Sequence, residues 1–225
     1  PAMSTTVTPV CDFNSYSYYR SGGVLLRLDK TSGSVLMEGL FPAAITDVVP
    51  SINDCLYIMQ GDSNPYWSAS TAGVFTKCVG TNGAGAGTSS ATYGDTWNSK
   101  FCTITLAGQL AYATAANAPQ TATPTWTNNS LISVGSQGTP VGLITYQDPN
   151  GTVTIYCPTT LGLLMNDFTN TVWLNTDLKI PSHADNGKGV CVQNGKLYYS
   201  AGLSVYELSF ESNVSNIKIM GLDTR

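Results

Sequence analysis

Carboxylates are the first candidates for chemistry in this sequence of 225 residues. Glycoside hydrolysis generally needs two carboxyl groups, one as an acid and one as a base or nucleophile. The chain holds eleven Asp but three Glu, and no Glu lies between Gly39 and Tyr206. A catalytic pair would therefore be two aspartates, such as Asp12 with Asp54 or with Asp148. Several aspartates, Asp148 among them, stand beside Gly, Asn or Pro, where the side chain typically bonds its own backbone in a turn.

Nucleophilic and metal chemistry have weaker signals. His183 is the single histidine, and a Ser-His-Asp triad would need it as the base. The sequence contains no Gly-x-Ser-x-Gly motif, no Cys-x-x-Cys pair of the kind that binds zinc, and no EF-hand pattern. The glycine-rich stretch 83–87 lacks the Lys-Ser/Thr ending of a phosphate-binding loop. We therefore expect no catalytic residues, no metal ion and no cofactor.

Aromatic rings beside polar turn residues point to binding instead. In sugar-binding sites a ring stacks on the sugar while Asn, Asp or Gly groups bond its hydroxyls. Trp97 is the best candidate, because its neighbours are polar turn formers. The predicted ligand-binding residues are Trp97, Trp67, Trp126, Trp173, Asp95 and Asn98. The alternative for each ring is packing between neighbouring sheets, where it buries a large area.

The composition excludes several classes of protein. Hydrophobic residues make up 42% of the chain and charged residues 11%, and 10 basic and 14 acidic residues give a net charge of −4. A disordered chain would have more charge and fewer apolar groups, and a nucleic-acid-binding surface would need clustered basic residues. No apolar run reaches the roughly 18 residues of a membrane-spanning helix. We expect neither a nucleic-acid partner nor membrane insertion.

Cysteines and glycosylation sequons bear on the compartment. Asn-x-Ser/Thr sequons at Asn128, Asn150 and Asn213 fit an extracellular protein. Six cysteines would allow disulfides. Four of them stand in short apolar runs at positions that we interpret as equivalent, which packing alone explains, so we predict free thiols. These four are Cys11, Cys55, Cys102 and Cys191. Residues 1–3 are interpreted as the remnant of an engineered fusion, and 1–225 as a single domain.

A repeat runs through the chain and predicts the elements that would position these residues. Five segments place a tyrosine among small residues, each after another short apolar run. The anchor tyrosines are Tyr18, Tyr66, Tyr112, Tyr156 and Tyr198, separated by 48, 46, 44 and 42 residues. The best internal match lays 18–29 on 198–209 without gaps. Five units in 225 residues average 45 residues each.

Each unit is predicted to be a meander of three or four short β-strands. Val, Ile, Thr and aromatic residues dominate, with period-two stretches such as 152–156, and recurring Asn-Gly pairs favour tight hairpins. The predicted strands are 141–147, 152–157, 162–166 and 172–179 in the fourth unit, and 189–192, 196–200, 204–210 and 217–220 in the fifth.

The period, strand content and turns resemble those of the β-propeller superfamily, in which stacked four-stranded sheets cover one another. The resemblance covers nearly the whole chain and implies an all-β fold, a five-bladed β-propeller with blades of about 45 residues. Motifs of particular propeller families are missing, and the double glycine Gly22-Gly23 occurs once. The alternative is a β-sandwich or jelly roll, which also has short strands and frequent turns.

The predicted function is recognition, because a propeller is a rigid frame that presents loops to a ligand. By analogy with five-bladed lectins, we expect a non-catalytic, lectin-like module that binds a glycan or a protein and is extracellular or on a virion surface. Two alternatives stay open. One is a structural or assembly protein of a viral particle, and the other is a propeller glycoside hydrolase that uses an Asp pair.

Overall fold

The computed structural model describes most of the chain, in two compact units. The described residues are 6–51, 54–61, 65–69, 73–78, 91–97, 100–113, 120, 126–167, 172–176, 178–179, 182, 188–210 and 217–222. The first unit comprises residues 1–105 and 110–128, and the second comprises 106–109 and 129–225. The assignment of 1–225 to a single domain stays a prediction.

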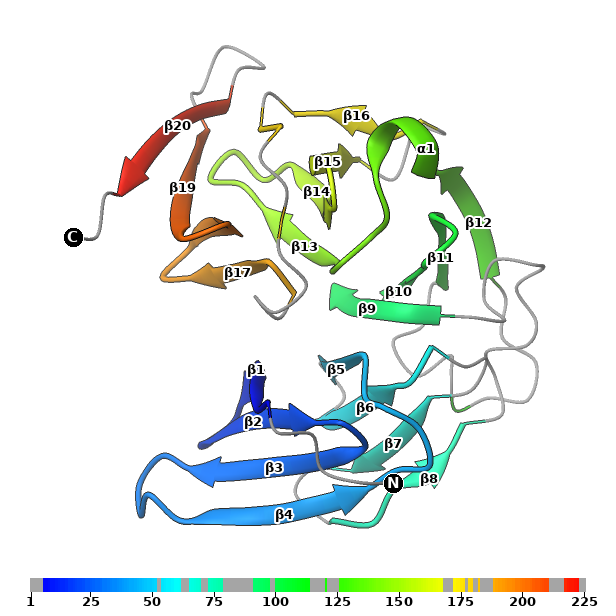
Figure 1. The fold of residues 1–225 in the computed structure, drawn as a ribbon, viewed down its shortest axis with the longest axis vertical. Coiled ribbons are helices and arrows are strands. Elements are labelled where there is room, and N and C mark those ends of the chain that lie inside the picture. The colour runs from blue at the N-terminus through cyan, green and yellow to red at the C-terminus, as the bar shows by residue number, and fades with distance from the viewer. Residues whose placement is uncertain are drawn as a thin grey trace. The chain divides into compact units, whose positions relative to one another are not determined.

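The first unit holds three four-stranded sheets, called blades 1 to 3 below (Figure 1). Blade 1 consists of β1 (Thr8–Phe13), β2 (Tyr16–Ser21), β3 (Val24–Asp29) and β4 (Val35–Leu40). Blade 2 consists of β5 (Asp47–Ser51), β6 (Cys55–Met59), β7 (Tyr66–Ala69) and β8 (Thr76–Lys77). Blade 3 consists of β9 (Ala91–Trp97), β10 (Lys100–Thr105), β11 (Gln109–Ala113) and β12 (Trp126–Leu131), which ends in the second unit.

The second unit holds blades 4 and 5 and one short helix, α1 (Val134–Gln137). Blade 4 consists of β13 (Ile144–Gln147), β14 (Val153–Thr159), β15 (Gly162–Asn166) and β16 (Leu174–Asn175). Blade 5 consists of β17 (Val190–Gln193), β18 (Lys196–Ala201), β19 (Ser204–Phe210) and β20 (Ile217–Leu222). The predicted strands 162–166 and 204–210 agree with β15 and β19 residue for residue.

Every blade is an antiparallel meander whose strands pair in chain order. In blade 1, for example, Tyr18 pairs with Cys11 on one side and with Arg27 on the other. Within the first unit β5 contacts both β1 and β9, and within the second unit β13 contacts β17, so the first strands of successive blades are neighbours. The predicted five-bladed β-propeller is confirmed. The β-sandwich alternative is wrong, because the strands form five separate four-stranded sheets.

Apolar faces of neighbouring blades pack on each other. Tyr18 and Leu25 of blade 1 share a buried cluster with Val48 and Ile58 of blade 2. Between blades 2 and 3, the rings of Tyr57 and Phe101 meet edge to face with centroids 4.8 Å apart. In the second unit, one buried cluster joins blade 4 to blade 5; it contains Tyr146, Tyr156, Leu163, Leu178, Val190, Leu197, Tyr199, Ala201 and Leu208.

The tyrosine repeat is not a strict strand repeat. Tyr18, Tyr156 and Tyr198 lie on the second strands of their blades, whereas Tyr66 and Tyr112 lie on the third strands of blades 2 and 3. Residues of the second and third strands of a blade alternate between apolar and polar in the same way, and both strands border a turn. A pattern within one strand therefore does not show whether it is the second or the third. The predicted number of units, five, is correct, but in two of them the anchor tyrosine lies on the third strand instead of the second.

The same shift corrects the expectation about the cysteines. Cys11 and Cys191 lie on first strands, but Cys55 and Cys102 lie on second strands, so the four positions are not equivalent. All six cysteines are free thiols, as predicted. Burial raises the pKa of the Cys102 and Cys157 thiols well above the usual range, which keeps them protonated and apolar in character.

Polar bonds join the first strands of blades 2 and 3. The Asp47 side chain on β5 is fully buried, and its carboxylate accepts hydrogen bonds from the Val48 N–H at 2.8 Å and the Gly94 N–H on β9 at 3.0 Å. The Thr96 hydroxyl donates to the Pro50 carbonyl at 2.6 Å. A buried carboxylate is costly unless it is well bonded, so this contact fixes how β5 and β9 lie against each other.

We predict that Asp47→Ala lowers the free energy of unfolding by about 3 kcal/mol, because two buried N–H groups lose their acceptor. Urea unfolding followed by circular dichroism measures the loss. Asp29→Ala is the matched control, since Asp29 also accepts two backbone N–H bonds, from Thr31 and Ser32, but these bonds are exposed to solvent. An equal loss in the two variants would contradict the role given to burial.

Candidate functional site

The tryptophans predicted to bind a ligand are buried to different extents. Trp173 in blade 4 is 1% exposed, so its ring has no face open to a ligand. Trp67 and Trp126 are partly buried against the cluster between blades 2 and 3, and Trp126 meets Phe101 edge-on at 6.3 Å. Packing of rings between sheets, the alternative expected from the sequence, describes the contacts of Trp67 and Trp126, and Trp173 is buried within the second unit.

Trp97 keeps its place as a candidate. It is partly buried at the end of β9, and the Lys100 Nζ lies 5.6 Å from its ring centroid. The Asp95 carboxylate accepts a bond from the Thr96 N–H at 2.9 Å, and Asn98 lies outside the described residues. Ligand binding by Trp97 and Asp95 stays a prediction.

The aspartates considered for hydrolysis are bonded to their own surroundings. Asp12 accepts from the Ser17 hydroxyl at 2.6 Å and pairs with Lys30 at 2.9 Å. Partial burial opposes ionisation of Asp12, but these two bonds and the charge of Lys30 outweigh it and lower its pKa.

The two possible partners of Asp12 lie in hairpin turns. Asp54 accepts from the Asn14 amide at 3.2 Å, and Asp148 caps its turn by accepting from the Asn150 and Thr152 N–H groups at 2.9 Å each. The bonds of Asp148 are those that Asp side chains commonly make in turns, whereas the bond to Asp54 links two turns of blades 1 and 2. His183 lies outside the described residues, and within the described part no group of three or more His, Cys, Asp or Glu could hold a metal ion.

A pocket of about 330 Å³ lies within the second unit, in blade 4 beside α1. We call it the blade-4 pocket. Helix α1, strand β15 and the segment that begins with β16 form its walls. It is lined by Ser136, Gln137, Leu161, Gly162, Leu163, Leu164, Asn175, Thr176, Leu178 and Lys179. Its volume is at the lower end of the range of small-molecule sites, about 300–1,000 Å³.

Hydrogen bonds hold two polar walls of this pocket in place. The Gln137 amide accepts from the Ser133 N–H and donates to the Trp173 carbonyl, both at 3.0 Å. The buried Thr176 hydroxyl donates to the Leu163 carbonyl at 2.7 Å and accepts from the Leu178 N–H at 3.2 Å. The pocket is therefore shaped before any ligand arrives, which lowers the entropic cost of binding.

Glycine is required where the two walls meet. A Cβ added at Gly162 would collide with the Leu178 carbonyl oxygen. The Leu163 N–H also donates to this oxygen at 3.0 Å, so the close approach is part of the pairing of these two segments. A larger residue at position 162 would push the Leu178 segment away from β15 and disturb the shape of the pocket.

Two polar side chains of the pocket are available to a ligand. Asn175 and Lys179 are exposed, and neither side chain has a hydrogen-bond or ion-pair partner within the described part of the chain. The amide can both donate and accept, and the ammonium group donates three bonds and carries a positive charge. Leu161, which is 51% exposed, adds an apolar surface beside them. This combination suits a ligand with hydroxyl or carboxylate groups and an apolar face.

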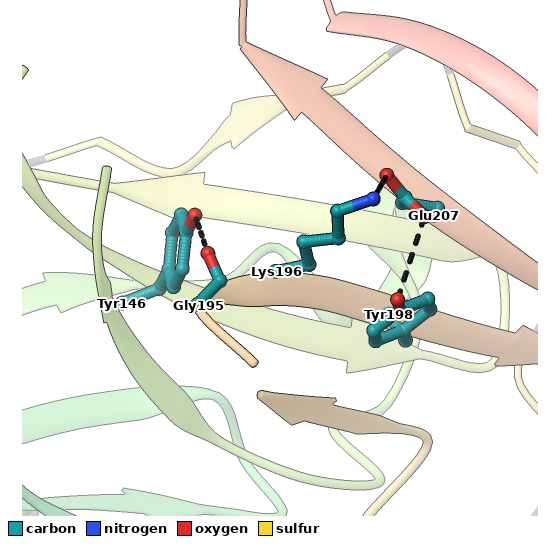
Figure 2. A network of polar contacts seen from close by, with 5 residues as sticks. All are labelled: Tyr146, Gly195, Lys196, Tyr198 and Glu207. Carbon is teal, nitrogen blue, oxygen red and sulfur yellow. Dashed lines mark hydrogen bonds and ion pairs between the residues drawn. The ribbon is translucent and has the colours of Figure 1, made fainter. Parts of the chain in front are cut away.

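A second polar cluster in the same unit has its groups bonded to one another (Figure 2). The Tyr146 hydroxyl of blade 4 donates to the Gly195 carbonyl of blade 5 at 2.8 Å. Lys196 pairs with Glu207 at 2.7 Å, and the Tyr198 hydroxyl reaches the other oxygen of that carboxylate at 3.4 Å. The bond to Glu207 raises the pKa of Lys196. Figure 2 shows these contacts joining β18 to β19 and a turn of blade 5 to β13, a structural role.

Sequence reasoning missed the blade-4 pocket. Gln137 lies in α1, about 40 residues before Asn175 and Lys179 in the segment that begins with β16, and none of the three stands in a motif or directly beside an aromatic residue. The close approach at Gly162 depends on a partner 16 residues away and has no local signature. Pairing of strands in three dimensions creates this site.

The sequence matches no protein-family model and no curated protein, but many solved structures are similar. One is a nidogen/laminin complex, with a TM-score of 0.64 at 8% identity over 92% of this chain and 76% of that chain. Another is the extracellular domain of a putative hybrid two-component system from B. thetaiotaomicron, with 0.63 at 13% identity over 100% of this chain and 30% of that one. A third is YCF48 bound to D1 peptide, with 0.57 at 11% identity over 97% and 69%. The likeness is one of fold.

The chain is thus similar in fold to β-propellers of unlike sequence and spans less than a third of the bacterial extracellular protein. None of the helices in the described part of the structure has the length and apolar character needed to cross a membrane.

We predict that Trp173→Ala lowers the free energy of unfolding by about 3–5 kcal/mol, as loss of a large buried ring does. Trp173→Phe should cost clearly less. It retains an aromatic ring and removes an indole N–H that is buried without a hydrogen-bond partner in the described structure. Thermal unfolding of the two variants gives the comparison, and a negligible effect of Trp173→Ala would contradict the packing role.

Proposed function

We propose that this chain is a non-catalytic recognition module that binds a glycan in the blade-4 pocket, outside the cell or on a virion surface. The observation that carries the proposal is the arrangement of that pocket. Hydrogen bonds fix its walls, while Asn175 and Lys179 keep their polar groups free within the described part of the structure. Preformed sites with a few convergent polar groups are typical of small-ligand binding.

The chemistry of the lining supports a sugar. Each sugar hydroxyl both donates and accepts, which the amide of Asn175 matches. Lys179 adds a donor that would favour a sugar carrying a carboxylate. The exposed face of Leu161 can cover the C–H face of the ring. These groups bind and orient a ligand, and the bonds made by Asp12, Asp54 and Asp148 give those carboxylates structural roles, which supports recognition over hydrolysis.

A location outside the cell has separate support. The structurally similar chains include extracellular domains from B. thetaiotaomicron. The sequon at Asn150 lies in the exposed turn between β13 and β14, where a glycosylating enzyme can reach it. Asn128 lies on β12, where its side chain is not described, and Asn213 lies outside the described residues.

A protein or peptide ligand is the second candidate, since two structurally similar chains were solved with such partners, in the nidogen/laminin complex and in YCF48 bound to D1 peptide. The two candidates differ in the test below. A glycan ligand gives signal on an array of glycans, whereas a protein ligand or a purely structural role in a particle gives none.

The test is binding of the purified chain to a glycan array, followed by calorimetry with the strongest hit. We predict that Lys179→Ala and Asn175→Ala each weaken binding about tenfold or more, because each removes a hydrogen bond to the ligand. Both side chains are exposed, so the midpoint of thermal unfolding should stay unchanged. Lys77→Ala, the same substitution on the exposed edge of blade 2, should bind like the original chain.

Trp97→Ala separates the blade-4 pocket from the surface predicted by the sequence. Loss of binding in Trp97→Ala with none in Lys179→Ala would move the site to blade 3. Binding that survives all three pocket and ring variants would contradict both assignments, and an array without signal would contradict the glycan itself.

We also predict that expression through a eukaryotic secretory pathway adds a glycan at Asn150. The mass of the secreted chain should fall on treatment with an N-glycosidase, and Asn150→Gln should remove that part of the shift. Thr152→Ala is the matched variant, because it destroys the sequon and leaves the asparagine. An unmodified Asn150 in secreted protein would contradict the accessibility that the exposed turn gives this sequon.

A further inference from the structure

Strand β4 is the outer edge of blade 1 (Figure 1). Of the described strands, β3 alone pairs with it, so the backbone groups on its other side face away from the sheet. Unpaired strand edges are templates for another strand, and proteins usually shorten, charge or cover them. The outer strands of blades 2 and 4, β8 and β16, are two residues long, whereas β4 has six, the same length as β12 and β20 at the edges of blades 3 and 5.

The β4 edge is also apolar. Val35 is 61% exposed, Leu36 52% and Met37 66%, and they stand consecutively in regular pairing with β3. Leu40 adds a fourth apolar side chain, 56% exposed. Successive side chains of a strand point to opposite faces, so Val35 and Met37 lie on one face of the sheet and Leu36 on the other. Both faces beside this edge therefore expose apolar side chains that water solvates poorly.

The charged residue of β4, Glu38, does not place its charge at the exposed edge of the strand. Glu38 occupies a bulge, where the pairing of Leu25 with Gly39 and of Leu26 with Met37 leaves it out of the backbone register with β3. Its carboxylate turns inward and pairs with Arg27 at 3.2 Å, and the two side chains are 7% and 15% exposed. The guanidinium of Arg27 also covers the ring of Tyr16, 4.5 Å from its centroid. The charge is thus neutralised inside blade 1.

We propose that β4 is a self-association edge, on which a second copy of this chain pairs its own β4 in antiparallel register about a two-fold axis. An antiparallel pairing of identical strands is self-complementary, as a two-fold interface requires. With the axis at Leu36, Val35 of one copy would lie opposite Met37 of the other. The partner edge is equally apolar and its glutamate is equally turned inward, so no like charges meet. Pairing of two six-residue strands involves few residues, and we therefore expect a weak, concentration-dependent dimer.

Sedimentation equilibrium of the full chain over a wide range of concentrations tests this inference. The expected result is a reversible monomer–dimer equilibrium for the original chain and a monomer for Met37→Lys, because the substitution places two ammonium groups in the pairing region. Val35→Lys is the second variant, so that poor folding of one does not decide the result. Circular dichroism establishes that each variant is folded.

Leu203→Lys is the matched control, since Leu203 is fully exposed in the turn between β18 and β19, away from any edge. It should dimerise like the original chain. A chain that is monomeric at every concentration overturns the inference and leaves the β4 edge to a strand of another protein. A dimer that survives both Met37→Lys and Val35→Lys also overturns it, because the interface then lies elsewhere. Neither outcome bears on the blade-4 pocket.

Discussion

Each four-stranded sheet of this chain has two apolar faces and can cover neither by itself. The structure meets this constraint by stacking blade on blade, so that Tyr18 and Leu25 are buried by Val48 and Ile58 of the next sheet. Because apolar burial is the main favourable contribution to folding, most large side chains are committed to these contacts. Two of the four tryptophans, Trp67 and Trp126, pack partly against the cluster between blades 2 and 3, and Trp173 is buried. Stacking therefore decides which residues are left for function.

Polar groups follow the same constraint. Where first strands meet, buried groups must find partners, and Asp47 does so through two backbone N–H groups. In blade 5 the charges of Lys196 and Glu207 satisfy each other (Figure 2). Against this background of satisfied groups, the free ends of Asn175 and Lys179 stand out, since they border a pocket whose other polar groups are bonded.

The architecture could be predicted from the sequence because its signals are local. Alternation of apolar residues and positive-φ turns such as Asn194-Gly195 mark hairpins within a few residues, and β15 and β19 were located to the residue. Local signals do not say which strand of a blade a run belongs to, which is why Tyr66 and Tyr112 fell one strand away from their expected positions.

Local sequence signals could not predict the blade-4 pocket, because contacts between distant segments create it. Polar neighbours suggested accessible tryptophans, but the exposure of Trp173 is set by packing against distant segments, and the blade-4 pocket exists because Gly162 lets the Leu178 segment approach β15. The ligand site that we propose lies where that close packing leaves a gap bordered by unbonded polar groups.

Methyl NMR of the leucines during titration with free glucuronic acid and N-acetylglucosamine tests the central claim most directly. The account predicts saturable shifts at Leu161, Leu164 and Leu178, which line the pocket, with little change at Leu25 and Leu56 in the first unit. Shifts concentrated in the first unit, or none with either sugar, would contradict it.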